Sequence, residues 1–180
     1  MKRRALLLAL PFAAPARAQT GLWPEWLGAY VGALSFYRSI PLQDIYPAPT
    51  VPHVDHDDPS PFSVSFTIRA EEDGAGVWLR IDGGPMQTAN AGETLRFGPP
   101  IDGFAQLIGA QARPTPRSAT LTVRPDSLGT EALFSHADGS FWRRHFNVRF
   151  TPTGADVIVW VFDAAGTRAR AWRGAAARRD

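Results

Sequence analysis

The chain contains no cysteine and, after Lys2, no lysine. The absence of cysteine excludes a disulfide-stabilised scaffold and any metal site with thiolate ligands. No segment keeps helical periodicity over a useful length, and no apolar run approaches the roughly 20 residues that a membrane-spanning helix requires. With 180 residues, 44% of them hydrophobic and 20% charged, the composition is typical of one folded domain rather than of a disordered chain.

The first 18 residues have the three parts of a secretory signal. Basic residues at positions 2–4 precede an apolar run at 5–14, and Ala16-Arg17-Ala18 provides the small residues of a cleavage site. A buried N-terminal helix is the alternative, but Pro11 and Pro15 disfavour it because helix interiors exclude proline. We expect cleavage after Ala18, or alternatively after Ala16. Residues 19–180 would then form a single domain that is periplasmic or secreted.

The charge of the chain changes sign when this leader is set apart. Of the 19 basic residues, four lie in the first 18 positions, where no Asp or Glu occurs. The remaining chain would carry 15 arginines against 17 carboxylates, a net charge of −2 in place of +2. A slightly acidic, exported domain is a poor candidate for nucleic-acid binding, which calls for a basic surface. We therefore expect no nucleic-acid partner.

Short segments of alternating apolar and polar residues dominate the rest of the chain. Phe62, Val64, Phe66 and Ile68, for example, alternate with polar residues, which is typical of a half-buried strand. The expected strands are 28–37, 62–69, 77–82, 95–97, 104–111, 120–124, 130–137, 140–150, 157–162 and 167–173. Tight turns join most of them. This predicts an all-β antiparallel meander of about eight to ten strands, with an up-and-down barrel favoured over a β-sandwich.

Residues 40–61 interrupt the strand pattern with six prolines. Proline fixes φ and removes a backbone donor, so we expect a long extended loop of the kind that often serves as a lid or binding loop. His53 and His56 lie in this loop beside Asp55, Asp57 and Asp58, and these donors suit zinc or a hard cation. Their spacing matches no defined site, so we assign no metal.

Two turns allow the strand register near the C-terminus to be estimated, because paired residues in antiparallel strands share a face. A two-residue turn at Asp138-Gly139 predicts pairing of His136 with Phe141 and of Phe134 with Arg143. A four-residue turn at 151–154 predicts four further pairs: Phe150 with Ala155, Arg149 with Asp156, Phe146 with Val159, and His145 with Trp160.

The second register separates an apolar face from a mixed one. The apolar face consists of Trp142, Phe146, Val148, Phe150, Val157, Val159 and Val161, and Arg144 interrupts it. The mixed face alternates polar groups with large aromatics: Arg143, His145, Asn147, Arg149, Asp156, Ile158, Trp160 and Phe162. The mixed face is either the wall of a ligand cavity or an outer face on which arginine stems cover aromatic rings. In the first case, Arg143, His145, Asn147, Trp160 and Phe162 are the candidate ligand-binding residues.

The segment Trp26-Leu27-Gly28-Ala29-Tyr30-Val31-Gly32 resembles the opening of calycin-type barrels such as lipocalins. In these proteins a Gly-x-Trp begins the first strand after a short helical lead-in, and Tyr30 stands here in place of the tryptophan. An arginine of the last lipocalin strand packs over that aromatic at the closed end, and Arg168 or Arg170 would be its counterpart. The resemblance implies an eight- to ten-stranded barrel that binds a small apolar or amphipathic molecule. It implies no catalytic residue.

Other chemistry finds less support in the sequence. No G-x-S-x-G motif or strand–helix context exposes a nucleophile, although an enzyme of another type stays open. His136 or His145 could serve as an axial haem ligand, but a lone strand histidine is more often a surface residue. We assign no cofactor. An outer-membrane barrel usually ends on an aromatic residue, and this chain ends Arg-Arg-Asp, so we expect no stable membrane insertion.

These observations predict an exported, non-catalytic binding protein for a small apolar or amphipathic ligand. The alternative is a structural or interaction module, a β-sandwich whose exposed aromatics bind a protein or polysaccharide partner.

Overall fold

The computed structural model describes residues 24–41, 62–71, 75–83, 92–135, 138–162 and 168–179. One turn of 3-10 helix, η1 (Pro24–Trp26), precedes ten strands. They are β1 (Gly28–Pro41), β2 (Phe62–Ala70), β3 (Val77–Gly83), β4 (Glu93–Phe97), β5 (Phe104–Gln111), β6 (Ser118–Arg124), β7 (Ser127–Ser135), β8 (Phe141–Thr151), β9 (Gly154–Phe162) and β10 (Arg168–Arg179).

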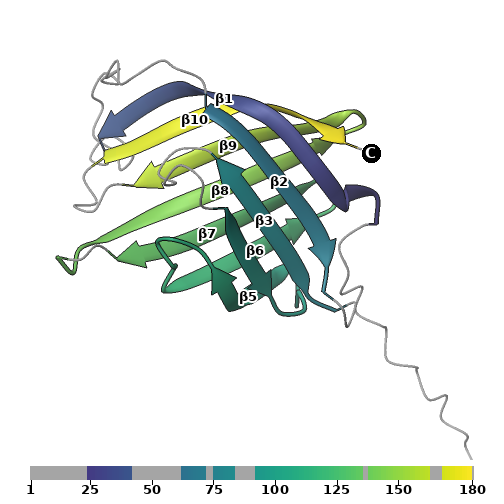
Figure 1. Cartoon of the computed structure of the whole chain (residues 1–180), viewed down its shortest axis with the longest axis horizontal. Coiled ribbons are helices and arrows are strands. Elements are labelled where there is room, and N and C mark those ends of the chain that lie inside the picture. Colours follow the sequence, from purple (N-terminus) through teal and green to yellow (C-terminus); the bar gives the residue numbers. More distant parts are fainter. Residues whose placement is uncertain are drawn as a thin grey trace, which may run out of the picture.

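The ten strands form a closed antiparallel barrel (Figure 1). Each strand pairs with its neighbours in the chain, and β1 closes the barrel by pairing with β10 from Ala29–Arg179 to Pro41–Arg168. The predicted all-β meander and barrel are therefore confirmed. An open β-sandwich is excluded because the first and last strands are hydrogen-bonded to each other.

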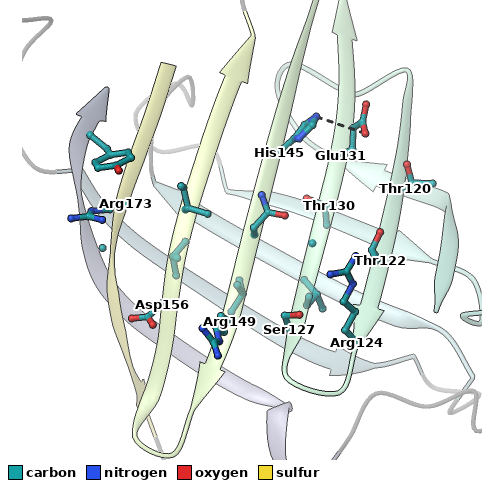
Figure 2. Close-up of a pocket in the computed structure, with 18 of the residues that line it drawn as sticks. Thr120, Thr122, Arg124, Ser127, Thr130, Glu131, His145, Arg149, Asp156 and Arg173 are labelled. Carbon is teal, nitrogen blue, oxygen red and sulfur yellow. Dashed lines mark ion pairs between the residues drawn. The ribbon is translucent and has the colours of Figure 1, made fainter. Parts of the chain in front are cut away.

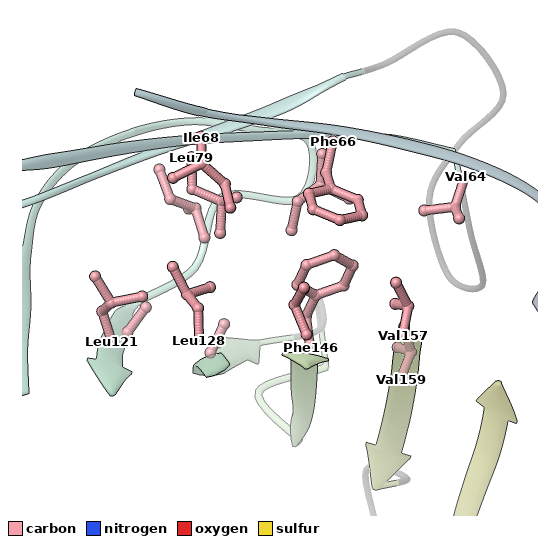
Figure 3. Packing of buried hydrophobic residues seen from close by; sticks show 14 of the residues in the cluster. Val64, Phe66, Ile68, Leu79, Leu121, Leu128, Phe146, Val157 and Val159 are labelled. Carbon is pink, nitrogen blue, oxygen red and sulfur yellow. The ribbon is translucent and has the colours of Figure 1, made fainter. Parts of the chain in front are cut away.

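The inner face of the barrel is packed with apolar side chains. Figure 3 shows Phe66, Ile68 and Leu79 on one side of the interior facing side chains from β6 to β9 on the other. Phe66 meets Phe146 edge to face, with ring centroids 5.4 Å apart. In the described part of the chain, the barrel interior is thus a core and not the lumen of a channel.

One charged pair lies within this core. Arg144, which interrupts the apolar face of β8, donates a hydrogen bond to Glu93 of β4, and both side chains are only 4% exposed. The guanidinium carbon of Arg144 lies 5.3 Å from the centroid of the Phe134 ring. Burial of a charge requires such a partner, because desolvation of an isolated charge is costly.

The N-terminal lead-in is fastened to the end of the barrel where β10 finishes. Arg178 donates hydrogen bonds to the carbonyl oxygens of Glu25 (2.6 Å) and Leu27 (3.0 Å). It lies beside Tyr30, its partner in the β1–β10 register. The expectation that Arg168 or Arg170 would take this place is wrong. The register sets those two residues opposite Pro41 and Ser39, at the other end of β1.

Strand β10 extends beyond the predicted 167–173. Small residues in β9, β10 and β1 allow the backbones of these three strands to approach closely. A Cβ on Gly174 would lie 1.8 Å from the carbonyl oxygen of Ala33, and a Cβ on Gly32 would lie 2.1 Å from that of Ala175. The residues after 173, beyond the last predicted strand, therefore complete the barrel. Alanine and glycine have low strand propensity, so the sequence pattern does not announce a strand here.

The two predicted registers have different outcomes. The pairs expected around the 151–154 turn are all observed. The pairs expected around Asp138-Gly139 are wrong by one residue, because Ser135 pairs with Phe141 and Phe134 pairs with Trp142. The Asp138 carboxylate accepts hydrogen bonds from the Ser140 amide and hydroxyl, which makes the connection longer than a two-residue turn. As a result, Phe134 faces inward and its ring stacks on that of Trp142, with ring centroids 4.1 Å apart.

Several predictions fall on other parts of the chain. The leader at 1–18, most of the predicted 40–61 loop (42–61, with His53 and His56) and His136 lie outside the described residues. Ile40 and Pro41, predicted to open that loop, are instead the last residues of β1. Within the described ranges, no helix is long and apolar enough to cross a membrane.

Candidate functional site

The mixed face of β8 and β9 is the outer face of the barrel. Along β8, Trp142, Arg144, Phe146 and Val148 are buried, while the alternate residues Arg143, His145 and Asn147 are exposed or half-buried. Because side chains alternate across a strand, the five candidate residues Arg143, His145, Asn147, Trp160 and Phe162 point away from the interior. Of the two interpretations of this face, the structure shows the outer one.

The outer face is hollowed by a groove that crosses the strands and has a volume of about 1160 Å³ (Figure 2). A continuous row of paired residues, here called the central row, runs through it from β5 to β1: Phe104, Thr122, Gly129, Asn147, Ile158, Arg173 and Ser35. All seven line the groove. Seven strands give six inter-strand steps of about 4.8 Å, so the row measures on the order of 30 Å.

Two further rows flank the central row and carry most of the charge. The upper row in Figure 2 consists of Thr120, Glu131 and His145, and the pairing continues to Trp160. The lower row consists of Arg124, Ser127, Arg149 and Asp156. The groove is therefore walled on both sides by side chains that can donate or accept hydrogen bonds.

The groove is deeper at its middle because Gly129 has no side chain to project into it. A Cβ at this position would lie 2.7 Å from the Asn147 side-chain oxygen. Without that Cβ, the Asn147 amide and the Thr122 hydroxyl are the polar groups on either side of the floor. A ligand in the groove can therefore approach the sheet closely at this point.

Four of the five predicted site residues form one cluster at the upper edge of the groove. The Phe162 ring lies 4.8 Å from the His145 ring and 5.3 Å from the guanidinium carbon of Arg143. Trp160 stacks on Phe162 with centroids 6.5 Å apart. Asn147, the fifth predicted residue, lies in the groove itself beside His145.

Glu131 ties this cluster together. Its two carboxylate oxygens lie 3.6 Å from Arg143 Nη1 and 3.7 Å from His145 Nε2 (Figure 2). Burial lowers the pKa of His145, and the nearby Arg143 lowers it further, while Glu131 opposes both effects. Since the net shift is downward, the imidazole is mainly neutral at pH 7. His145 Nε2 is buried and lies on the side of the ring toward Glu131, so this nitrogen is held within the cluster.

Exposed aromatic rings mark both ends of the groove. Tyr37 of β1, 40% exposed, lies at one end, and Arg173 covers one face of its ring at 4.4 Å. Phe104 of β5, 57% exposed, lies at the other end beside the exposed Ile101, with which it pairs. An amphipathic ligand can thus contact apolar surface at each end and polar groups between.

Sequence reasoning missed Glu131, Gly129, Arg124 and Ser127. It placed Arg149 and Asp156 on the mixed face but did not count them among the ligand-binding candidates. The tight connection at Pro125-Asp126, which pairs Arg124 with Ser127, was the available signal. Pro-Asp between two alternating segments is a turn signature, and reading it would have started β7 at Ser127. It would then have aligned β6, β7 and β8 into the rows described above.

Comparison of the chain with protein-family models, curated proteins and solved structures gives no match. The chemistry of the groove is therefore argued from its own residues.

Proposed function

We propose that this protein is an exported, non-catalytic binding protein and that its ligand occupies the groove on the outer face of the barrel. The observation that carries the proposal is the central row, a line of seven paired residues that all line one groove. The groove has a polar middle and an exposed aromatic ring at each end, Tyr37 and Phe104, which suits an elongated amphipathic molecule. The leader-like residues 1–18 support the export.

A ligand inside the barrel, as the calycin resemblance implies, has less support. The inner face is occupied by side chains in mutual contact, such as Phe66 on Phe146 and Phe134 on Trp142. A ligand between them would have to displace well-packed rings, at a cost of several kcal/mol.

Native mass spectrometry of the protein purified gently from the periplasm tests the proposal through its co-purifying ligand. Gly129→Leu fills the floor of the groove at small structural cost, because the Cβ meets only the mobile end of Asn147. We expect the wild-type protein to retain a bound mass that Gly129→Leu loses.

Gly109→Leu is the matched control, since a Cβ there meets only Arg96 at 3.9 Å and Gly109 does not line the groove. It should keep the ligand. Retention of the bound mass by Gly129→Leu, or the absence of any bound mass in the wild-type protein, would contradict the proposal.

A further inference from the structure

The geometry points to an acidic oligosaccharide chain as the occupant of the groove, an inference that rests on the proposed function. Four observations carry it: the length of the central row, the kind of polar group along it, the position of the aromatic rings and the distribution of arginines.

The length and openness of the groove favour a linear polymer over a compact ligand. The row crosses seven strands and measures on the order of 30 Å, which is longer than most single metabolites. The groove is only partly enclosed, so it can hold the middle of a longer chain as well as an end.

The polar groups of the groove match sugar hydroxyls better than a peptide backbone. Because the groove lies across the strands, the backbone groups of its floor are engaged in the sheet, and an extended peptide cannot add to it as a strand. Contacts must come from side chains. Thr122, Asn147 and His145 provide a hydroxyl, an amide and a neutral imidazole, each able to donate or accept.

The aromatic rings stand where an extended sugar chain would place its outer rings. A sugar ring has an apolar face of C–H groups, which packs against an exposed aromatic ring. Tyr37 and Phe104 lie at opposite ends of the groove and are the two exposed aromatics that line it. A hydrocarbon chain would instead need a continuous apolar lining, and charged side chains interrupt the lining of this groove.

The charges select an acidic chain. Three arginines line the groove, Arg124 and Arg149 in the lower row and Arg173 in the central row. Of the two lining carboxylates, Glu131 is placed near Arg143 and His145 in the upper cluster, and Asp156 lies opposite Arg149 in the lower row, which leaves Arg124 and Arg173 without a lining carboxylate as register partner. Arg149 also faces Asp126 at 3.6 Å, but both side chains are largely exposed, so this pair is easily exchanged for a ligand carboxylate. Guanidinium groups bind carboxylates in a bidentate manner, so a uronic acid chain fits the lower row.

Isothermal titration calorimetry with oligogalacturonate tests the inference, with a neutral malto-oligosaccharide and an oligoglutamate peptide as comparison ligands. We expect oligogalacturonate to bind at least tenfold more tightly than either. The double variant Arg124→Ala/Arg149→Ala should weaken its binding by about a hundredfold, since each charge-assisted contact is worth about tenfold or more. Arg69→Ala, an exposed arginine that stacks on Trp78 of β3 outside the groove, should leave the affinity unchanged.

Equal affinity for the neutral and acidic sugars, tighter binding of oligoglutamate, or an unchanged affinity of the double variant would overturn the inference. If oligogalacturonate fails to bind while the co-purifying mass still depends on Gly129, the proposed groove stands and only the ligand class is wrong. If neither binding is found, both proposals fail.

Discussion

At the scale of single residues, the buried Glu93–Arg144 pair contributes more to the choice of strand pairing than to the free energy of unfolding. Removing one partner leaves the other charged and buried, which costs far more than removing both. The surrounding side chains are apolar, including Phe134 against the Arg144 guanidinium. The pair therefore acts as a constraint on which strands meet inside the barrel.

We predict that Glu93→Leu lowers the free energy of unfolding by about 3–5 kcal/mol. The double variant Glu93→Leu/Arg144→Met should recover most of this loss, because both charges are then replaced by apolar volume. Urea denaturation followed by tryptophan fluorescence measures both. A double variant no more stable than the single one would show that the charges themselves hold the fold.

His145 makes the free energy of unfolding of the barrel depend on pH, and the direction of this dependence follows from its pKa. Its pKa in the folded state is lowered by burial, so the unfolded chain binds the proton more readily. Stability therefore rises with pH between the folded-state pKa and about 6.5, the pKa of the unfolded residue. Arg143 strengthens this effect and Glu131 weakens it.

We predict that His145→Asn reduces the loss of stability on acidification from pH 7.5 toward pH 5.5, and that Glu131→Gln increases it. Unfolding free energies measured across this range give both slopes. Parallel slopes for the wild-type protein and His145→Asn would mean that His145 is not desolvated in the folded state.

At the scale of elements, η1 and the ends of β1 and β10 form one unit. The Trp26 indole donates to the carbonyl oxygen of Pro125 at 2.9 Å and stacks on Phe150 at 4.6 Å. Arg178 binds the carbonyl oxygens on both sides of Trp26 in the chain. These contacts join the lead-in to the β6–β7 turn as well as to β10, so the lead-in covers this end of the barrel.

Arg178→Ala should destabilise this unit by about 1 kcal/mol, because its two hydrogen bonds are charged but solvent-exposed. Hydrogen exchange should show faster opening at the start of β1 and little change in β8. Arg179→Ala, the exposed neighbour, serves as the control and should behave as the wild-type protein. Unchanged exchange in β1 of Arg178→Ala would contradict the fastening role.

The elements also show where sequence reasoning succeeds. Period-two alternation placed β2 and β3 closely, because each buries one face and exposes the other. It missed the second half of β10, where Gly174 and its alanine neighbours allow close backbone approach and carry no alternation. The turn prediction at Asp138-Gly139 was also wrong. The Asp-Gly pair alone predicts a two-residue turn, but the Asp138 side chain accepts a hydrogen bond from Ser140 and the connection is longer.

At the scale of the whole molecule, closure of the sheet determines which face of each strand points into the barrel and which points outward. The strand pattern separated an apolar face from a mixed face without saying which one pointed inward. Pairing of β1 with β10 turns the apolar faces of all strands toward one another and leaves the mixed face outside. The candidate residues were therefore grouped correctly by sequence, while their position relative to the barrel required the long-range register.

The same closure places the groove. Residues separated by more than 100 positions, such as Ser35 and Asn147, come into one row only because β1 follows β10 around the barrel. No local pattern contains that information, since it depends on every register between β5 and β1. The central row is thus a property of the closed sheet, and its use as a binding surface is our central claim.

A crystal structure of the protein purified gently from the periplasm, with its co-purifying ligand retained, tests this claim most directly. We expect ligand density along the central row, in contact with Thr122, Asn147 and Arg173. Density between the inner side chains, for example between Phe66 and Phe146, or an empty groove in a protein shown to carry its ligand, would contradict it.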